Sequence, residues 1–313
     1  MMNVNLIYQR LKYLIMRLLS SLKNDSFIET FKKINKTLSK KNKINLDEIF
    51  EKFSDENLED LFLRFGTDKG KYDGKKTYDL MQKDLNFKKK FKDYKSWILR
   101  SKIQEFDYQL GLNFTPVYEK YFKPIKNKKL NILEIGVANG HSSAAFLIFF
   151  PNSFIYGMDM KDEYKLFYNS KRYSYNKIDI FSEKKINQFK KKQIEFDIII
   201  DDSLHDQQGI TTNLKNFYPL LKPNGFYVIE DFKLDDLIIK GTRDFNIKNG
   251  KKFQFYTQFT CEEIFEKINK KIYFDHSILN SDFQKIIYSF NNKVSVHFND
   301  HPFSSICVIN KNA

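Results

Sequence analysis

The chain has 313 residues, of which 42% are hydrophobic, and carries a formal net charge of +14. This length and apolar content allow one large domain with a packed core, and they exclude a disordered or collagen-like chain. No apolar stretch reaches the roughly 18 residues of an ordinary transmembrane helix. The two cysteines, Cys261 and Cys307, are too few for a disulfide framework or a cysteine zinc cluster, which favours a reducing cytosol.

The positive charge comes almost entirely from lysine, since the sequence has 47 Lys and 6 Arg. Arginine is the residue that reads phosphates and bases with two hydrogen bonds, so its scarcity argues against nucleic acid as a partner. We interpret the charge as a solvated basic surface. A weak attraction to anionic lipid or polyanionic sugar is the alternative.

Residues 1–60 are predicted to form a basic helical N-terminal region. Within residues 3–23, apolar side chains recur at helical spacing, with basic residues between them. The segment lacks the basic cluster and the cleavage site of a signal peptide. Two interpretations are open. The helix packs on the protein or on a second subunit of a homo-oligomer, or it makes a peripheral contact with the inner face of the membrane.

Residues 61–125 are predicted to be an auxiliary or lid segment. It contains the glycine-rich, turn-like stretch FGTDKGKYDGKK, which starts at Phe65, and helical texture follows over 78–123. Pro124 and a basic turn at 126–129 mark its end.

Residues 126–313 differ from the preceding sequence in their pattern of apolar residues. Short apolar runs at 130–137, 154–160, 175–180, 196–202 and 225–231 alternate with helix-compatible stretches. This alternation predicts an α/β fold, a doubly wound and mostly parallel Rossmann-like sheet with helices on both faces. An insertion is expected at about 235–300. Because ligands of such sheets bind at the carboxyl ends of the strands, the residues that end each run are the candidates for function.

Glycines and acids end these runs. Gly136 and Gly140 follow the first run with the spacing G-x-x-x-G, which differs from the dinucleotide pattern G-x-G-x-x-G and disfavours a nicotinamide cofactor. Asp159 ends the second run, where a carboxylate can accept hydrogen bonds from both ribose hydroxyls. Asp179 ends the third run beside Ile180, a pair that suits the edge and face of an adenine.

These motifs together resemble the class I S-adenosylmethionine-dependent methyltransferases. More narrowly, the chain is similar to the metal-dependent sugar O-methyltransferases of macrolide and surface-polysaccharide biosynthesis. The matching stretches are FGTDKG, YEKYF at 118–122, NILEIG at 131–136, FDIIIDDSLH at 196–205 and GFYVIED at 225–231. The resemblance covers roughly residues 61–232 and returns at the final strand, 304–311.

The resemblance implies a role for each strand-end residue. The residues expected to bind S-adenosyl-L-methionine are Glu134, Gly136, Gly140, Asp159, Asp179 and Asp201. Asp202, Glu230 and Asp231 are expected to hold Mg²⁺ or another divalent cation, and His205 is expected to be the catalytic base. The sequence departs from the family at Ser203 and Leu204, which are usually glycine and serine, and at Asn113, where relatives often have histidine.

The expected chemistry explains why these residue types occur together. Carboxylates that converge from neighbouring strand ends repel one another unless a cation lies between them, and oxygen ligands suit Mg²⁺. A sugar hydroxyl becomes a better nucleophile when a metal lowers its pKa and a histidine takes its proton.

Each residue also has a plainer interpretation. Asp202 could cap a helix, His205 could be a surface histidine, and the acid pair at 230–231 could lie in a solvated loop. The joint arrangement favours a site, because both acid pairs end consecutive buried runs. His141, His276, His297 and His301 lack such a placement and are interpreted as structural or exposed.

The sequence therefore predicts an S-adenosylmethionine- and Mg²⁺-dependent O-methyltransferase that acts on a sugar hydroxyl of a glycan, glycolipid or sugar intermediate. An RNA methyltransferase is one alternative, motivated by the charge and opposed by the scarcity of arginine and of RNA-binding motifs. A non-catalytic membrane-surface protein that retains the fold is the other, motivated by the basic N-terminal segment.

Overall fold

The computed structural model describes residues 43–67, 69–70, 112–161, 166, 168–232, 260–269, 293–298 and 305–311. The predictions for residues 3–23, for 71–111 and for most of the insertion lie outside these ranges, and so do His276 and His301. The predicted membrane contact and the predicted homo-oligomer depend on residues 3–23. In the described ranges, no helix is both long and apolar enough to cross a membrane.

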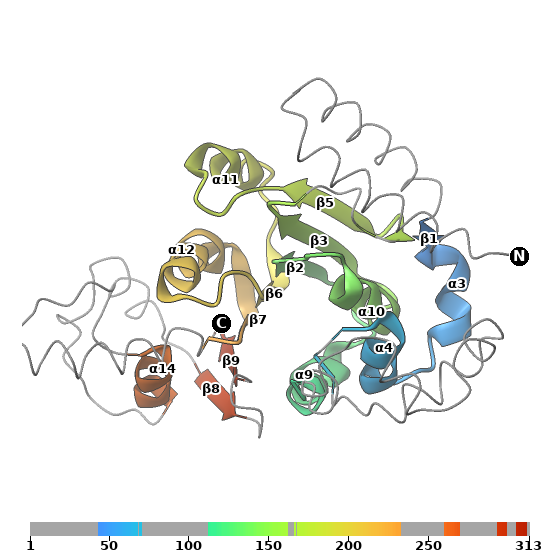
Figure 1. The fold of residues 1–313 in the computed structure, drawn as a ribbon, viewed down its shortest axis with the longest axis horizontal. Helices are drawn as coiled ribbons and strands as arrows, with labels where there is room; N and C mark the ends of the chain where they lie inside the picture. Colours follow the sequence, from blue (N-terminus) through green and yellow to red (C-terminus); the bar gives the residue numbers. More distant parts are fainter. Residues whose placement is uncertain are drawn as a thin grey trace, which may run out of the picture.

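The described strands form a seven-stranded sheet in the order β5-β3-β2-β6-β7-β9-β8 (Figure 1). The first five run parallel, whereas β9 pairs antiparallel with β7 and β8 antiparallel with β9. A separate short parallel pair joins β1 to β4. This confirms the predicted α/β fold with a mostly parallel, doubly wound sheet. The bounds are β1 Ile44–Asn45, β2 Asn131–Ile135, β3 Phe154–Asp159, β4 Tyr168–Asn169, β5 Tyr173–Lys177, β6 Phe196–Asp201, β7 Leu221–Glu230, β8 Lys293–Phe298 and β9 Ser305–Asn310.

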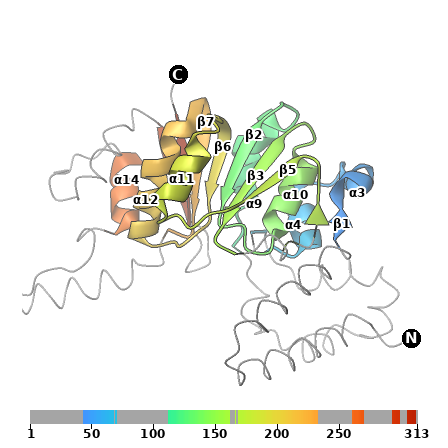
Figure 2. The same cartoon turned by 90° about the horizontal axis from the view of Figure 1, so that it is seen from above.

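Helices cover both faces of the sheet (Figure 2). On one face lie α11 (Glu183–Lys190), α12 (Gln207–Phe217) and α14 (Cys261–Asn269), and on the other lie α3 (Leu46–Phe53), α4 (Leu58–Phe65), α9 (Thr115–Phe122) and α10 (His141–Phe149). Short 3₁₀ turns, η1 (Lys123–Ile125) and η3 (Tyr218–Leu220), follow α9 and α12.

Strand β6 shows why the predicted runs are apolar without interruption. Side chains of a strand point alternately to opposite faces. Ile199 packs in the cluster under α12, whereas Ile198 and Ile200 pack in the cluster under α10. Because helices cover both faces, every position in the middle of the strand is buried.

The described part of the N-terminal region packs directly on the sheet domain. Phe62 of α4 makes edge-to-face contacts with Tyr118 and Phe146, and Asp47 of α3 accepts hydrogen bonds from the Ser170 hydroxyl and the Lys171 N–H. The boundary predicted after residue 60 falls inside α4. Helical spacing identifies such a helix but does not reveal which surface its apolar face covers.

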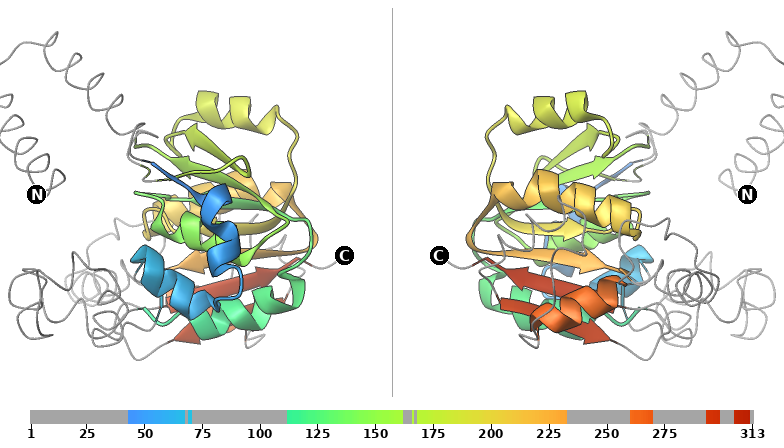
Figure 3. Two further views of the ribbon diagram at one scale, coloured as in Figure 1. Left: turned by 90° about the vertical axis from the view of Figure 1, so that its right-hand side faces the viewer. Right: turned by 90° about the vertical axis from the view of Figure 1, so that its left-hand side faces the viewer.

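The expected insertion contributes to the sheet domain at its far edge. Ile264 and Phe265 of α14 are fully buried, and Phe265 packs edge-to-face on Phe232. Residues Lys293–Phe298 form the edge strand β8. Figure 3 shows α14 on one side of β8 and β9 and α9 on the other side.

Candidate active site at the strand ends

The loop between β2 and α10 presses against the backbone that follows β6. Gly136 and Gly140 both adopt left-handed conformations, with φ of 93° and 86°. A Cβ atom on Gly136 would lie only 1.9 Å from the carbonyl oxygen of Asp202. Because only glycine has no Cβ, this position allows the loop to approach Asp202 closely.

A cavity of about 310 Å³ opens at these strand ends. Its walls come from the glycine loop with the start of α10, from the segment after α4, and from Asp202. The lining residues are Gly66, Thr67, Lys69, Gly136, Val137, Ala138, Asn139, His141, Ser142 and Asp202. The sequence predicts Gly136 and Asp202 at this place, whereas Gly66, Thr67 and Lys69 are recognisable in it only as part of a turn-like stretch and of the family resemblance.

His141 also lines the cavity, whereas it is interpreted from the sequence as structural or exposed. Its Nδ1 lies 2.5 Å from the carbonyl oxygen of Phe65, so the ring joins the start of α10 to the end of α4. The sequence feature that could have indicated this position is that His141 directly follows Gly140 of the glycine loop.

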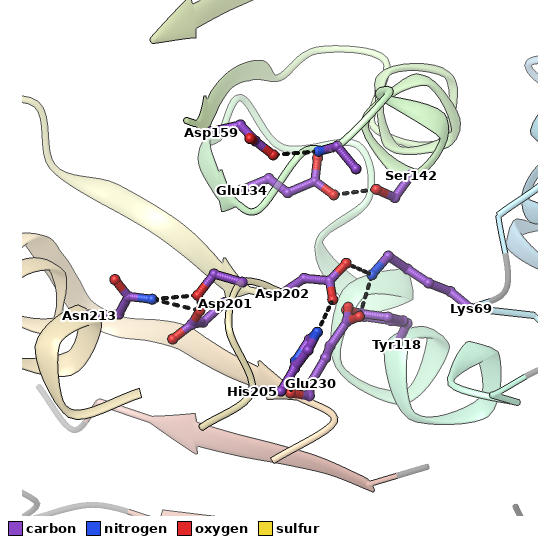
Figure 4. Close-up of polar contacts among 12 residues, drawn as sticks. Lys69, Tyr118, Glu134, Ser142, Asp159, Asp201, Asp202, His205, Asn213 and Glu230 are labelled. Carbon is purple, nitrogen blue, oxygen red and sulfur yellow. Dashed lines mark hydrogen bonds and ion pairs between the residues drawn. The ribbon is translucent and has the colours of Figure 1, made fainter. Parts of the chain in front are cut away.

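Three predicted cofactor-binding acids are not among the residues that line the cavity. Glu134 is fully buried and accepts hydrogen bonds from the hydroxyls of Ser142 and Ser143 in α10, and burial raises the pKa of its carboxyl. Asp159 accepts the N–H of Ala138 at 2.7 Å, which ties the end of β3 to the glycine loop (Figure 4). Asp179, in the turn after β5, accepts the N–H of Phe181.

Asp201 points away from the cavity. Its Oδ1 accepts hydrogen bonds from Ser203 Oγ and from Asn213 Nδ2 of α12, each at 2.8 Å. Burial raises the pKa of Asp201 to about 7. Strand alternation sends Asp201 and Asp202 to opposite faces of the sheet. Asp201 is predicted to bind the cofactor. In the structure its side chain instead bonds to Ser203 and to Asn213 of α12.

Asp202 and Glu230 point into one buried cluster with Lys69 and Tyr118 (Figure 4). The Lys69 ammonium lies 2.6 Å from Asp202 Oδ2 and also contacts Glu230 Oε2. The Tyr118 hydroxyl donates to Glu230 Oε1. Complete burial and the neighbouring Asp202 charge raise the pKa of Glu230, and the Lys69 ammonium opposes that rise. Burial beside Glu230 also raises the pKa of Tyr118.

His205 presents one ring nitrogen to this cluster. It has a left-handed backbone, with φ of 58°, and its Nδ1 lies 3.1 Å from the Glu230 carbonyl oxygen. In the neutral ring Nδ1 then carries the proton, so the lone pair is on Nε2. Nε2 lies 3.6 Å from Asp202 Oδ1.

Donor atoms of Asp202, His205 and Asp231 all lie within 4.8 Å of one another. The two carboxylate oxygens suit a divalent cation such as Mg²⁺ or Mn²⁺, and the single lone pair of His205, on Nε2, is available either to ligate that cation or to accept a proton beside it. The predicted set contained Glu230 in place of His205. In this geometry Glu230 lies on the side of Lys69 and Tyr118, whereas Asp231, one residue beyond the strand and with φ of 49°, contributes to the donor group.

The positions where the sequence departs from the family lie close by. Asn113 donates its N–H to the Gly70 carbonyl oxygen and does not line the cavity. Ser203 bonds to Asp201. Leu204, directly before His205, is 41% exposed, and its Cβ would lie 2.8 Å from a Cβ on Gly209.

The chain is similar to known methyltransferases. Residues 126–289, more than half of the chain, match the family model described as a methyltransferase domain. Over 125 residues the chain is 32% identical to the mycinamicin VI 2''-O-methyltransferase of Micromonospora griseorubida and 30% identical to the demethylmacrocin O-methyltransferase of Streptomyces fradiae. Each match covers 38% of this chain and 31% of the relative, so the matched part spans about a third of these relatives.

Among solved structures, the chain is similar to the MycE methyltransferase of the mycinamycin pathway in complex with Mg and SAH. The identity is 22%, the TM-score is 0.47, and the match covers 69% of this chain and 53% of that chain. The family match includes strands β2 to β7, the glycine loop, Asp202, His205 and Asp231. The chain therefore belongs to the methyltransferase domain family.

Proposed function

We propose that this protein is an S-adenosylmethionine-dependent O-methyltransferase that uses a divalent cation, Mg²⁺ in the first instance, to methylate a sugar hydroxyl. The observation that carries the proposal is the convergence of Asp202, His205 and Asp231 beside a cavity bounded by the glycine loop. Two further relatives whose names specify a glycosylated acceptor, the 8-demethyl-8-alpha-L-rhamnosyl tetracenomycin-C 2'-O-methyltransferase of Streptomyces olivaceus and the L-olivosyl-oleandolide 3-O-methyltransferase of Streptomyces antibioticus, support the choice of a sugar as acceptor.

In this proposal the cavity takes the cofactor. S-adenosylmethionine supplies an electrophilic methyl group when it is bound. Gly136 lets the loop pack against the Asp202 backbone, and Asp159 holds the loop through the Ala138 N–H. Holding both reactants at attack distance is itself worth several kcal/mol, about 7–11 in the best intramolecular cases.

Asp202 and Asp231 hold the cation in this proposal, and the cation makes a nearby hydroxyl more acidic. His205 accepts the proton of that hydroxyl at Nε2, because the Glu230 carbonyl oxygen fixes the proton of the neutral ring on Nδ1. Glu230 as an additional ligand stays a prediction. A Glu230→Gln variant tests it through the affinity for Mn²⁺.

The proposal is tested with the purified full-length chain and a panel of sugar nucleotides and glycosylated acceptors. Release of S-adenosylhomocysteine is followed with Mg²⁺ and with EDTA. We expect turnover on at least one sugar acceptor, no turnover in EDTA, and recovery of turnover when Mg²⁺ is added back. Full activity in EDTA would remove the cation from the mechanism, and turnover on RNA alone would replace the sugar as substrate.

Asp202→Ala and Asp197→Ala make a matched pair for this assay. Both residues belong to β6 or directly follow it, but Asp197 lies at the opposite end, where it pairs with Lys222. We expect the first substitution to abolish Mg²⁺-dependent turnover and the second to leave it within a factor of about two. Equal losses would show that the effect comes from strand stability rather than from the site.

A further inference from the structure

A buried lysine lies inside the acid cluster. Lys69 is 2% exposed, and its ammonium contacts Asp202 and Glu230 together (Figure 4). These two carboxylates come from the carboxyl ends of the neighbouring strands β6 and β7. One ammonium therefore bridges both strand ends, at a distance of 133 residues in sequence from Asp202.

Backbone contacts fix the path of the loop that carries Lys69. Helix α4 ends at Gly66, whose left-handed conformation lets its N–H reach two carbonyls of the last turn. Beyond the loop, Phe114 donates its N–H to the Lys69 carbonyl oxygen at 2.7 Å. These anchors are backbone groups, so neither of them requires the lysine side chain.

The carboxylates of this cluster are costly to bury without a positive charge. Glu230 has no exposed surface, and Glu134 is also fully buried nearby. Removing the partner of a buried charge is strongly destabilising, because the remaining charge is left uncompensated. The ammonium of Lys69 and the hydroxyl of Tyr118 each contact one oxygen of Glu230, so both oxygens have donors before any divalent cation binds.

We propose that Lys69 is a positioning residue, the resident counter-ion of Asp202 and Glu230. It holds the two strand ends in place in the cation-free protein and limits how tightly the site takes a divalent cation. The second half of this proposal rests on the proposed function, and the first half does not. The two cations compete because the same carboxylate, Asp202, faces both.

Lys69→Met tests the proposal, because methionine keeps much of the length and removes the charge. Lys222→Met is the matched control, since Lys222 pairs with Asp197 at 2.8 Å across the opposite ends of β6 and β7. Mn²⁺ affinity is measured by the paramagnetic signal of free Mn²⁺. Thermal unfolding is measured in EDTA and in excess Mg²⁺.

We expect Lys69→Met to bind Mn²⁺ more tightly, by roughly tenfold, because a positive charge a few ångströms from the ion has been removed. The same variant should melt earlier than wild type in EDTA and regain most of the loss in Mg²⁺. Lys222→Met should show neither effect. An unchanged or weaker Mn²⁺ affinity, with the same loss of melting temperature in both buffers, would overturn the proposal.

A double-mutant cycle with Glu230→Gln tests the metal-independent half. In EDTA the second substitution should restore part of the stability that Lys69→Met loses, because glutamine leaves no unpaired buried charge. The double variant should fold even where Lys69→Met alone does not. Additive losses would overturn the counter-ion role. Failure of wild type to bind Mn²⁺ would instead overturn the cation of the proposed function.

Discussion

The two ends of the strand pair β6 and β7 carry the same kinds of charge in different surroundings. At the amino ends, Lys222 pairs with Asp197, and their side chains are 34% and 24% exposed. At the carboxyl ends, Lys69 pairs with Glu230, and their side chains are 3% and 0% exposed. An exposed ion pair contributes about 0–1 kcal/mol, because water and salt screen it.

The buried pair differs because its charges cannot be screened by water. Its members act on one another and on Asp202, and on any cation that enters beside them. A lysine–carboxylate pair is therefore expected to contribute little at the exposed edge of the sheet. At the buried edge it is expected to affect both stability and cation binding.

The largest effect is expected at His205. His205→Ala should lower the chemical step by roughly 10²–10⁴ while cofactor binding is kept, because the proton acceptor is lost. Part of the loss should return at high pH, where hydroxide replaces the base. Single-turnover kinetics measure the step, and Lys222→Met should stay near wild type. Full activity of His205→Ala would remove the base from the mechanism.

The next effect is expected at Gly136. Gly136→Ala should weaken S-adenosylhomocysteine binding by at least tenfold or unfold the glycine loop, because its Cβ would lie 1.9 Å from the Asp202 carbonyl oxygen and φ is 93°. Gly225→Ala is the control at the opposite edge, where the nearest contact, with the Asp197 carbonyl oxygen, is 2.9 Å. Calorimetric titration with S-adenosylhomocysteine measures the affinity of both variants. Equal affinities would place the cofactor elsewhere.

A smaller effect is expected for conservative changes of Asp202, which directly follows β6, and of Asp197 near the start of β6. Asp202→Asn should weaken Mn²⁺ binding by about tenfold, since a charged ligand becomes neutral, and excess Mg²⁺ should restore part of the turnover. Asp197→Asn should leave Mn²⁺ affinity unchanged. If both variants bind Mn²⁺ as wild type does, the acid cluster is not the cation site.

The smallest effect is expected at Asp47, a surface carboxylate like Asp197. Burial opposes its ionisation, but hydrogen bonds from the Lys171 N–H and the Ser170 hydroxyl outweigh burial and lower its pKa. Its contribution is therefore present above the unfolded pKa and is lost as pH falls through the folded pKa. Asp47→Asn should cost well under about 1 kcal/mol at neutral pH. Denaturant unfolding of both proteins between neutral and acid pH checks it, and a constant difference would contradict the assignment.

The parallel sheet and the meeting of its carboxyl strand ends could be predicted from local pattern. The separation of Asp201 from Asp202 could have been predicted as well. Buried runs alternating with helices indicated a parallel sheet, and the carboxyl ends of parallel strands meet at one edge. This was enough to predict Asp202 and the pair Glu230 and Asp231 at one edge, whereas the group found within 4.8 Å contains His205 in place of Glu230. The same alternation could have separated Asp201 from Asp202, since neighbouring residues of a strand face opposite sides.

The α/β class, the glycine loop and the strand-end acids are predictable from short-range periodicity and from the topology that this periodicity selects. The surroundings of those acids depend on tertiary packing. Lys69 and Tyr118 reach Glu230 from segments 161 and 112 residues away in sequence. Their contact depends on how α4 and α9 pack against the sheet, and no local pattern encodes that packing, because it minimises the exposed surface of the whole domain.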